Sequence, residues 1–201
     1  MTFWDFCAPF YDFAEQRNAK AYNAMVKTVR EVVPDGASVL EIAAGTGSIS
    51  LGIADKVRNV LCTDKSIKML TVARKKAEKR NVKNINFGNA DIFNIDKPDG
   101  AFNVVIAGNV IHLIDAPEKA AAELRRTASG MVILPMSFIK GLKGLAKLMV
   151  NIYRLFGFAP KRELALSEYA SFLSGIGFEN CEIIPLEGVI PIAVAVWRKN
   201  W

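Results

Sequence analysis

Acidic side chains stand at the ends of three short apolar runs, where they could hold one shared ligand. They are Glu41, Asp64 and Asp91, and Gly45 and Gly47 follow the first of them closely. Glycine lets a ligand approach the backbone, and ionised carboxylates attract cations and accept hydrogen bonds from hydroxyl groups. A carboxylate beside the loop would also repel a pyrophosphate. The spacing therefore predicts a nucleoside-type ligand that carries positive charge.

The residues around the first acid favour a loop between a strand and a helix. Val39–Ile42 is mostly apolar without alternation, as in a strand buried on both faces of a parallel sheet. From Ser48 onward the spacing is that of a helix start, so the loop presents free N–H groups above the strand. Ser50 takes the place of the third glycine in the pyrophosphate-binding fingerprint, and with Glu41 it argues against a nicotinamide oxidoreductase.

The rest of the chain alternates between expected strands and helices. The expected strands cover residues 37–42, 57–63, 82–87, 102–107, 130–136, 178–186 and 189–197. Strands that alternate with helical patterns favour a parallel sheet, whereas the turn at Glu187-Gly188 favours an antiparallel hairpin. We therefore expect an α/β fold, a Rossmann-like three-layer sandwich with about seven strands, mostly parallel, and an antiparallel hairpin at the edge.

The stretch VLEIAAGTG, residues 39–47, resembles motif I of the class I S-adenosylmethionine-dependent methyltransferases. The pattern of that family is an acid, any residue, then three glycines separated by single residues. Glu41, Gly45 and Gly47 match it, and Ala43 replaces the first glycine. The resemblance implies S-adenosyl-L-methionine as cofactor, S-adenosyl-L-homocysteine as product, and in-line transfer of a methyl group to a small-molecule acceptor.

The same resemblance implies a role for each residue at the strand ends. Glu41 and the two glycines would hold the methionine end of the cofactor, Asp64 the ribose, and Asp91 with Ile92 the adenine. Asp91 alone would be an ordinary turn residue, and Met69 fits a core position equally well. The remaining cofactor-binding candidates are Ala43, Thr46, Lys65, Asn89 and Ala90, together with Asn109, which would border the transferred methyl group.

His112 and Tyr11 are the candidate catalytic residues on the acceptor side. His112 is the only histidine of the chain, and imidazole titrates near neutrality, so it could act as a base or orient the acceptor. A structural role at a helix start is the alternative. Tyr11-Asp12 resembles a pair found in ubiquinone/menaquinone-type methyltransferases, and it lies in the aromatic residues 1–34. We expect this segment to form a helical cap over the cleft, or else to pack against the sheet edge.

Residues 137–165 are expected to form a basic helical lid inserted after the fifth strand. The helix predicted over residues 138–158 carries apolar residues and cations but no acid. A surface helix normally mixes both charge signs, so this one favours a lid, a transient contact with a membrane surface, or a partner interface.

Composition and motifs limit the remaining choices. The chain has 201 residues, 51% of them hydrophobic, and a net charge of +6, which fits a single domain over residues 1–201, monomeric or homodimeric. The three cysteines match neither a disulfide framework nor a metal site, and no signal peptide or apolar transmembrane run is visible, so we expect a cytoplasmic protein without a metal.

Two other functions stay open at this stage. A nucleic-acid methyltransferase is the first, although no Asn-Pro-Pro-Tyr motif and no Pro-Cys nucleophile are present. The second is a non-catalytic cofactor-binding protein that interacts with a partner through its basic helix.

Overall fold

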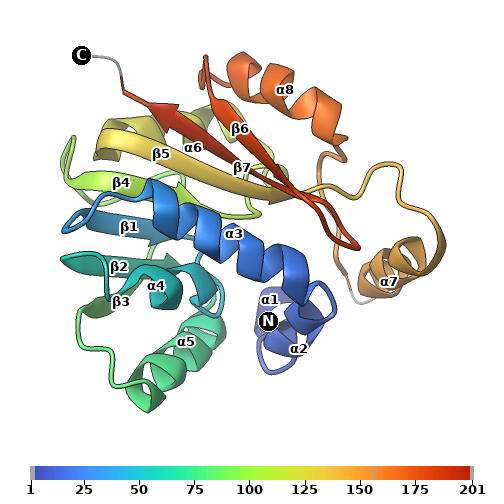
Figure 1. The fold of residues 1–201 in the computed structure, drawn as a ribbon, viewed down its shortest axis with the longest axis horizontal. Coiled ribbons are helices and arrows are strands. Elements are labelled where there is room, and N and C mark those ends of the chain that lie inside the picture. Colours follow the sequence, from blue (N-terminus) through green and yellow to red (C-terminus); the bar gives the residue numbers. More distant parts are fainter. Residues whose placement is uncertain (1–2, 156, 200–201) are drawn as a thin grey trace.

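The computed structural model describes residues 3–155 and 157–199 and builds them around a seven-stranded sheet. Figure 1 shows the strand order β3-β2-β1-β4-β5-β7-β6. Both ends of the predicted domain and position 156 of the predicted lid lie outside the described residues. The strands are β1 (Ser38–Ile42), β2 (Asn59–Asp64), β3 (Ile85–Asn89), β4 (Phe102–Ala107), β5 (Ala128–Ser137), β6 (Glu182–Leu186) and β7 (Ile192–Arg198).

Pairing is parallel in most of the sheet and antiparallel at one edge. β1 lies between β2 and β4, and the β2–β3 and β4–β5 pairs are also parallel. β7 runs antiparallel to both β5 and β6. The predicted α/β fold with an antiparallel edge hairpin is therefore confirmed. The hairpin strands begin later than predicted, at Glu182 and Ile192, because the residues before them form the turns that enter and join the two strands.

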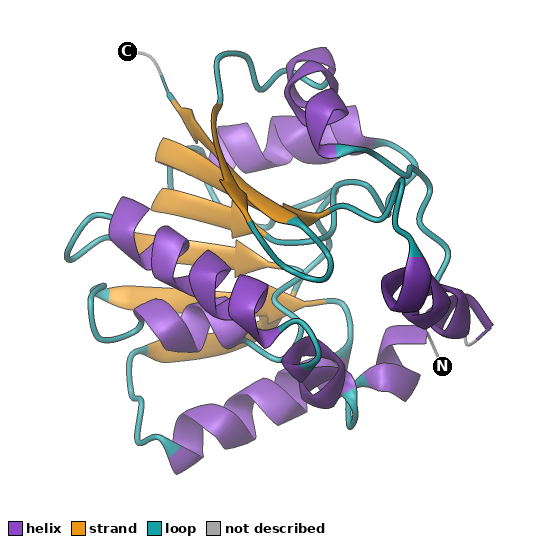
Figure 2. Cartoon of the chain, turned by 45° about the vertical axis from the view of Figure 1, so that its right-hand side comes forward, coloured by secondary structure: helices purple, strands orange, loops and turns teal. Residues whose placement is uncertain are grey.

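Helices cover both faces of the sheet, as Figure 2 shows. Successive residues of β1 point to opposite layers: Val39 joins the core cluster that contains Met25 of α3, and Leu40 joins the cluster that contains Leu124 of α6. The α-helices are α1 (Phe3–Cys7), α2 (Tyr11–Gln16), α3 (Ala19–Val32), α4 (Ser48–Ile53), α5 (Ile67–Lys79), α6 (Pro117–Thr127), α7 (Gly144–Leu155) and α8 (Tyr169–Gly175).

The N-terminal segment, expected to form a helical cap, is divided into three helices in its described part. α2 ends at Gln16 and α3 begins at Ala19, with Asn18 between them. The side-chain NH2 group of Asn18 donates to the carbonyl oxygen of Ile190 over 2.8 Å. The side-chain oxygen of Asn18 accepts from the backbone N–H of Ile190. This contact with the β6–β7 turn fixes a change of chain direction that helical periodicity cannot indicate.

The basic helix is also shorter than the predicted range 138–158. α7 covers Gly144–Leu155 only. Gly141 and Gly144 have φ angles of +82° and +56°, and Gly157 has +100°. These left-handed conformations suit glycine and stop a right-handed helix on both sides.

α3 packs closely on α4 through a glycine. A Cβ built on Gly52 would lie 2.2 Å from Cγ1 of Val26. The Arg30 side chain of α3 also donates to the Gly52 carbonyl oxygen over 3.1 Å. The contact fixes α4, and with it the loop between β1 and α4, against α3.

We expect Gly52→Ala to lower the free energy of unfolding by about 1–3 kcal/mol, because the new methyl group displaces a side chain that is stiff in a helix. Urea denaturation measures the change. Gly175→Ala is the matched control, since a Cβ on this helical glycine would meet nothing within 4 Å. The control should be neutral or stabilise by up to about 1 kcal/mol. Equal effects of the two substitutions would contradict the close α3–α4 contact.

Candidate active site

The loop between β1 and α4 contains three residues in the left-handed conformation. Gly45 and Gly47 have φ angles of +55° and +74°, as their sequence positions suggested, and Ala43 has +54°. A left-handed non-glycine residue costs about 1 kcal/mol. The loop therefore keeps a glycine-type geometry at position 43 although the residue there has a side chain.

The side chain of Glu41 is buried beneath this loop, with 3% of the residue exposed. Its Oε2 accepts from the backbone N–H of Ser50 over 2.8 Å and from the Ser50 hydroxyl. The carboxylate thus links the end of β1 to the first turn of α4. The sequence indicated Ser50 only as a missing glycine, and its role as the hydrogen-bond donor to a buried acid was not foreseen.

Asp64 lies at the end of β2, beside the glycine loop. One carboxylate oxygen accepts from the N–H of Gly45 over 2.8 Å and the other from the N–H of Ser66 over 2.7 Å. Burial raises the pKa of this carboxyl above its ordinary value, and the two backbone hydrogen bonds oppose that shift. Ser66 is the N-cap of α5, because its side chain accepts from the Met69 N–H. The helix is therefore capped by Ser66 and not by Asp64.

Asp91 follows β3 on the same side of the sheet and is more exposed. It accepts from the Phe93 N–H over 3.0 Å, as an aspartate in a turn does, and its Oδ2 lies 3.4 Å from Nζ of Lys65. Asn89 donates to the carbonyl oxygens of Asp64 and Lys65, which links the ends of β2 and β3. These contacts bring four of the predicted cofactor residues together.

The other predicted residues near this edge differ in exposure. Met69 and Ile92 are buried, with 1% and 8% exposed, and Ala90 packs against the core partly buried. Their apolar side chains pack in the core beneath the ends of the strands. Thr46, at 1% exposed, belongs to the loop, and its hydroxyl donates to Asp12 of α2.

The N-terminal helices lie against the loop and the end of β2. Lys76 of α5 contacts the carboxylate of Asp12 over 3.0 Å, and the Ser66 hydroxyl donates to Asp5 of α1 over 2.6 Å. A Cβ on Gly45 would meet only the ring of Tyr11, at 3.9 Å. The sequence pointed to Tyr11 and Asp12, whereas Asp5 and Lys76 gave no signal because both look like ordinary surface charges.

A cavity of about 430 Å³ lies between the N-terminal helices, α7 and the ends of β4 and β5. Asn109, which follows β4, has a φ angle of +52°, and its side-chain oxygen accepts from the Ser137 N–H over 2.7 Å. The cavity thus reaches the side of the sheet where the strands end and where the three acids lie. Most of its lining is aromatic or aliphatic, including Phe3, Trp4, Phe10, Tyr11, Leu113 and Phe158.

His112 lines this cavity and is nearly buried, with 7% exposed. Burial lowers the pKa of the imidazole to about 4, so the ring is uncharged at neutral pH. Its Nδ1 and the hydroxyl oxygen of Ser137, which also lines the cavity, are buried and have no hydrogen-bond partner among the described residues. Two buried polar atoms without a partner therefore belong to residues that line a mostly apolar cavity. Ser137 was not predicted, since a single serine after a strand gives no signal.

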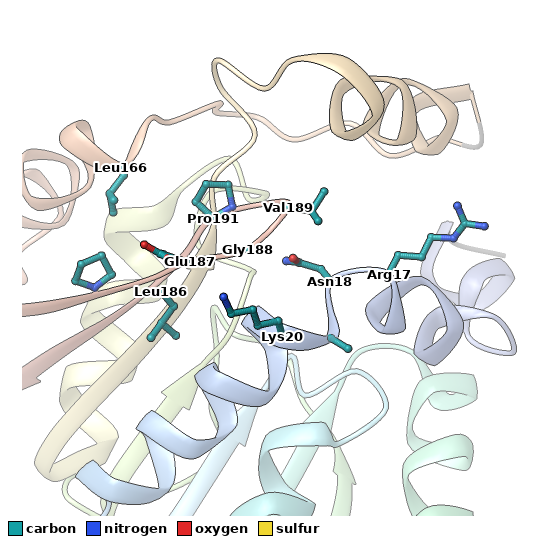
Figure 3. A pocket seen from close by; sticks show the side chains of 11 residues that line it. Arg17, Asn18, Lys20, Leu166, Leu186, Glu187, Gly188, Val189 and Pro191 are labelled. Carbon is teal, nitrogen blue, oxygen red and sulfur yellow. The ribbon is translucent and has the colours of Figure 1, made fainter.

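A second, shallower depression of about 770 Å³ lies beside the cavity, between the start of α3 and the β6–β7 turn. Figure 3 shows Lys20, Glu187 and Val189 around it. It shares Arg17, Asn18 and Val189 with the apolar cavity, but neither His112 nor Asn109 lines it. The shallow depression is therefore separate from the strand ends that carry the predicted site residues.

Within the part of the chain that the structure describes, no group of three or more His, Cys, Asp or Glu side chains could hold a metal ion.

We expect Ala43→Gly to leave the protein as stable or to stabilise it by up to about 1 kcal/mol, because it removes a side chain from a left-handed conformation. Ala44→Gly is the control, since Ala44 is not among the residues with positive φ. It should destabilise the protein by roughly 0.5–1 kcal/mol through the greater freedom of the unfolded chain. Urea denaturation compares the two, and a larger loss for Ala43→Gly would refute the assigned loop geometry.

The low pKa of His112 makes a second prediction for this site. The only imidazole of the chain should titrate in an NMR pH series with a midpoint near 4 rather than 6.5. The unfolded state therefore binds a proton at His112 more tightly than the folded state does. The contribution of the uncharged His112 ring to the free energy of unfolding is complete above pH 6.5 and is lost as the pH falls toward about 4. Between pH 6.5 and about 4, the free energy of unfolding of the wild type should fall by roughly 3 kcal/mol more than that of His112→Gln. A midpoint above about 6 would exclude a buried neutral ring.

Comparisons with known proteins point to one family. The family model described as "Methyltransferase domain" matches residues 39–129, which run from β1 to the start of β5. An uncharacterised methyltransferase of Bacillus subtilis, YcgJ, is 25% identical over 138 residues, or 68% of this chain and 54% of the relative. A demethylmenaquinone methyltransferase of Renibacterium salmoninarum is 31% identical over 127 residues, or 61% of this chain and 51% of the relative. The chain spans about half the length of these curated relatives.

A solved structure supports the fold. The magnesium protoporphyrin IX methyltransferase of Synechocystis, determined with bound S-adenosylhomocysteine, superimposes with a TM-score of 0.70. The alignment covers 94% of this chain and 88% of that protein at 18% sequence identity. At this identity the likeness concerns the architecture alone.

Proposed function

We propose that this chain, which belongs to the class I S-adenosylmethionine-dependent methyltransferases, transfers a methyl group from that cofactor to a small-molecule acceptor. One observation carries the proposal: the apolar cavity that contains His112 and Ser137 extends to Asn109 and to Tyr11, whose ring faces the glycine loop. A site for the cofactor and a site for an acceptor would thus meet at the ends of β1 and β4.

The residues at the loop fit the cofactor of this family. A Cβ on Gly45 would meet only the Tyr11 ring, so the loop leaves room for a ligand to approach its backbone. Asp64 keeps lone pairs beyond its two backbone hydrogen bonds and would accept the ribose hydroxyls. Asp91 with Ile92 would border the adenine. Glu41 would act through the loop that it supports, because its side chain is buried against Ser50.

When bound, the cofactor supplies a methyl group that its sulfonium already activates, so the protein must mainly align the reacting atoms. Asn109, held by Ser137 at the ends of β4 and β5, would border the reacting methyl group. His112 is a weak base at a pKa of about 4. We therefore assign its Nδ1 the orientation of the acceptor by a hydrogen bond rather than removal of a proton at neutral pH. Tyr11 would separate the two sites and exclude water.

The domain arrangement follows the same proposal. Residues 1–34 would act as a cap, held by the contacts of Asp5 with Ser66 and of Asp12 with Thr46. Residues 137–165 would act as a lid, because residues of α7 and Phe158 line the cavity. A small acceptor suits a cavity of about 430 Å³ better than a nucleic acid does, since an exposed basic groove is what a polynucleotide backbone requires.

Isothermal titration calorimetry with S-adenosylmethionine and S-adenosylhomocysteine tests the proposal. We expect micromolar binding, and Asp64→Ala should weaken it by roughly 2 kcal/mol or more because charge-assisted hydrogen bonds are lost. NADH should not bind, since its pyrophosphate requires a different loop.

The matched control is Asp35→Ala, in the turn that precedes β1 at the opposite end of that strand from the loop. The Asp35 side chain is 88% exposed, and its substitution should leave binding unchanged. Absence of binding of either ligand to the wild-type protein, or equal losses for both variants, would reject the assigned site.

A further inference from the structure

One face of α7 exposes a stripe of aliphatic side chains. Leu145, Leu148, Ile152 and Leu155 are 69%, 54%, 43% and 85% exposed. Their spacing of three and four residues places them on one side of a helix. Ala146 and Val150 are buried on another side, at 7% and 5% exposed. Among the side chains that the structure describes in α7, Ala146 and Val150 are therefore buried while the leucines and the isoleucine face outward, the reverse of the usual pattern of a surface helix.

The N-terminal helices add aromatic side chains to the same side of the molecule. Phe6, Phe10 and Phe13 are 51%, 66% and 61% exposed. Figures 1 and 2 both show α1 and α2 next to α7, and the Phe158 ring lies 6.1 Å from that of Phe3. We call the exposed side chains of both parts the apolar face. It consists of Phe6, Phe10, Phe13, Leu145, Leu148, Ile152 and Leu155.

The apolar face continues into the cavity. Phe6, Phe10 and Ile152 line the cavity and are also exposed, as is Val189 of the β6–β7 turn. These side chains therefore form its mouth. A molecule that leaves the apolar face for the cavity would stay in contact with apolar groups.

The charges around the apolar face are mainly positive. Lys143 and Lys147 beside the stripe, and Arg17 and Lys20 near the cavity mouth, form no ion pair with an acid in the described residues. Other cations are compensated: Lys140, Arg154 and Lys161 pair with Glu168, Glu163 and Asp115.

Two acids of the N-terminal helices, Asp5 and Asp12, point away from this border. Asp5 and Asp12 make their contacts inward, with Ser66 and with Thr46 and Lys76. The apolar face is therefore bordered by cations without an acidic partner in the described residues, one of which, Arg17, lies over the Phe13 ring. This border complements a surface that is apolar inside and anionic at its boundary.

We propose that the apolar face docks on the surface of an anionic lipid bilayer, and that the methyl acceptor is an apolar molecule which enters the cavity from the lipid phase. The part that concerns the acceptor depends on the function proposed above, whereas docking itself does not. In the described part of the chain, no helix is both long and apolar enough to cross a membrane. Contact would thus be limited to the interface, with the aliphatic stripe among the lipid head groups and upper acyl chains.

Vesicle flotation tests the docking. Wild-type protein should float with vesicles that mix phosphatidylglycerol with phosphatidylcholine, and bind pure phosphatidylcholine vesicles much less. Lys143→Glu/Lys147→Glu should weaken binding about tenfold or more, since each cation near an anionic surface contributes substantially. The matched control is Lys75→Glu/Lys79→Glu on α5, which changes the net charge equally on exposed residues outside the apolar face.

Leu145→Ser/Leu155→Ser should also weaken binding about tenfold or more, because it removes the two most exposed aliphatic side chains of the stripe. Both sets of variants alter exposed residues, so their unfolding transitions should match wild type. Calorimetry with S-adenosylmethionine serves as the separate readout of the proposed function, and these variants should bind it normally.

Docking would be overturned by failure of the wild type to float, or by equal binding to neutral and anionic vesicles. It would also be overturned if the α5 control lost as much binding as the α7 variants. A protein that forms dimers or binds nucleic acid through this face, without floating, would give the first of these results. Flotation without cofactor binding would refute the proposed function and leave the docking surface in place.

Discussion

A buried carboxylate supports the part of the structure on which the candidate site depends. Glu41 lies beneath the loop and accepts both the backbone N–H and the hydroxyl of Ser50. A buried charge is tolerated only where hydrogen bonds replace its hydration. The interaction therefore fixes where β1 stops and α4 starts, and the left-handed residues between them have little freedom. Asp64 then joins the same unit through the Gly45 N–H.

The sides proposed for the cofactor and for the acceptor are built in different ways. Polar atoms on the cofactor side are already engaged with backbone N–H groups or with the N-terminal helices, which holds them in place before any ligand arrives. On the proposed acceptor side the walls are mostly aromatic and aliphatic, and Nδ1 of His112 and the hydroxyl oxygen of Ser137 have no hydrogen-bond partner among the described residues. A hydrogen-bonded polar loop thus lies on one side of the Tyr11 ring and a mostly apolar cavity on the other.

The sequence predicted the fold well because its information is local. Short apolar runs and the Gly45 and Gly47 loop each depend on neighbouring residues, and the parallel sheet with its edge hairpin followed from them. The contacts that were missed join distant residues. Asn18 bends the N-terminal segment by binding Ile190, and Asp5 reaches Ser66, with no periodicity to reveal either pairing. Ser50 looked like a missing glycine because the burial of Glu41 depends on packing above the strand.

The contact between Asn18 and Ile190 has a consequence for the order in which the molecule is assembled. The glycine loop and its acids come from β1 to β3, a continuous stretch of the first half of the chain. The cavity, in contrast, needs the N-terminal helices together with a turn near the other end of the chain. During synthesis the first half emerges and can form its strand–helix units early, whereas the walls of the cavity close only after the last hairpin has left the ribosome. Until then the N-terminal aromatic side chains lack their final neighbours, so this segment exposes apolar surface for much of synthesis.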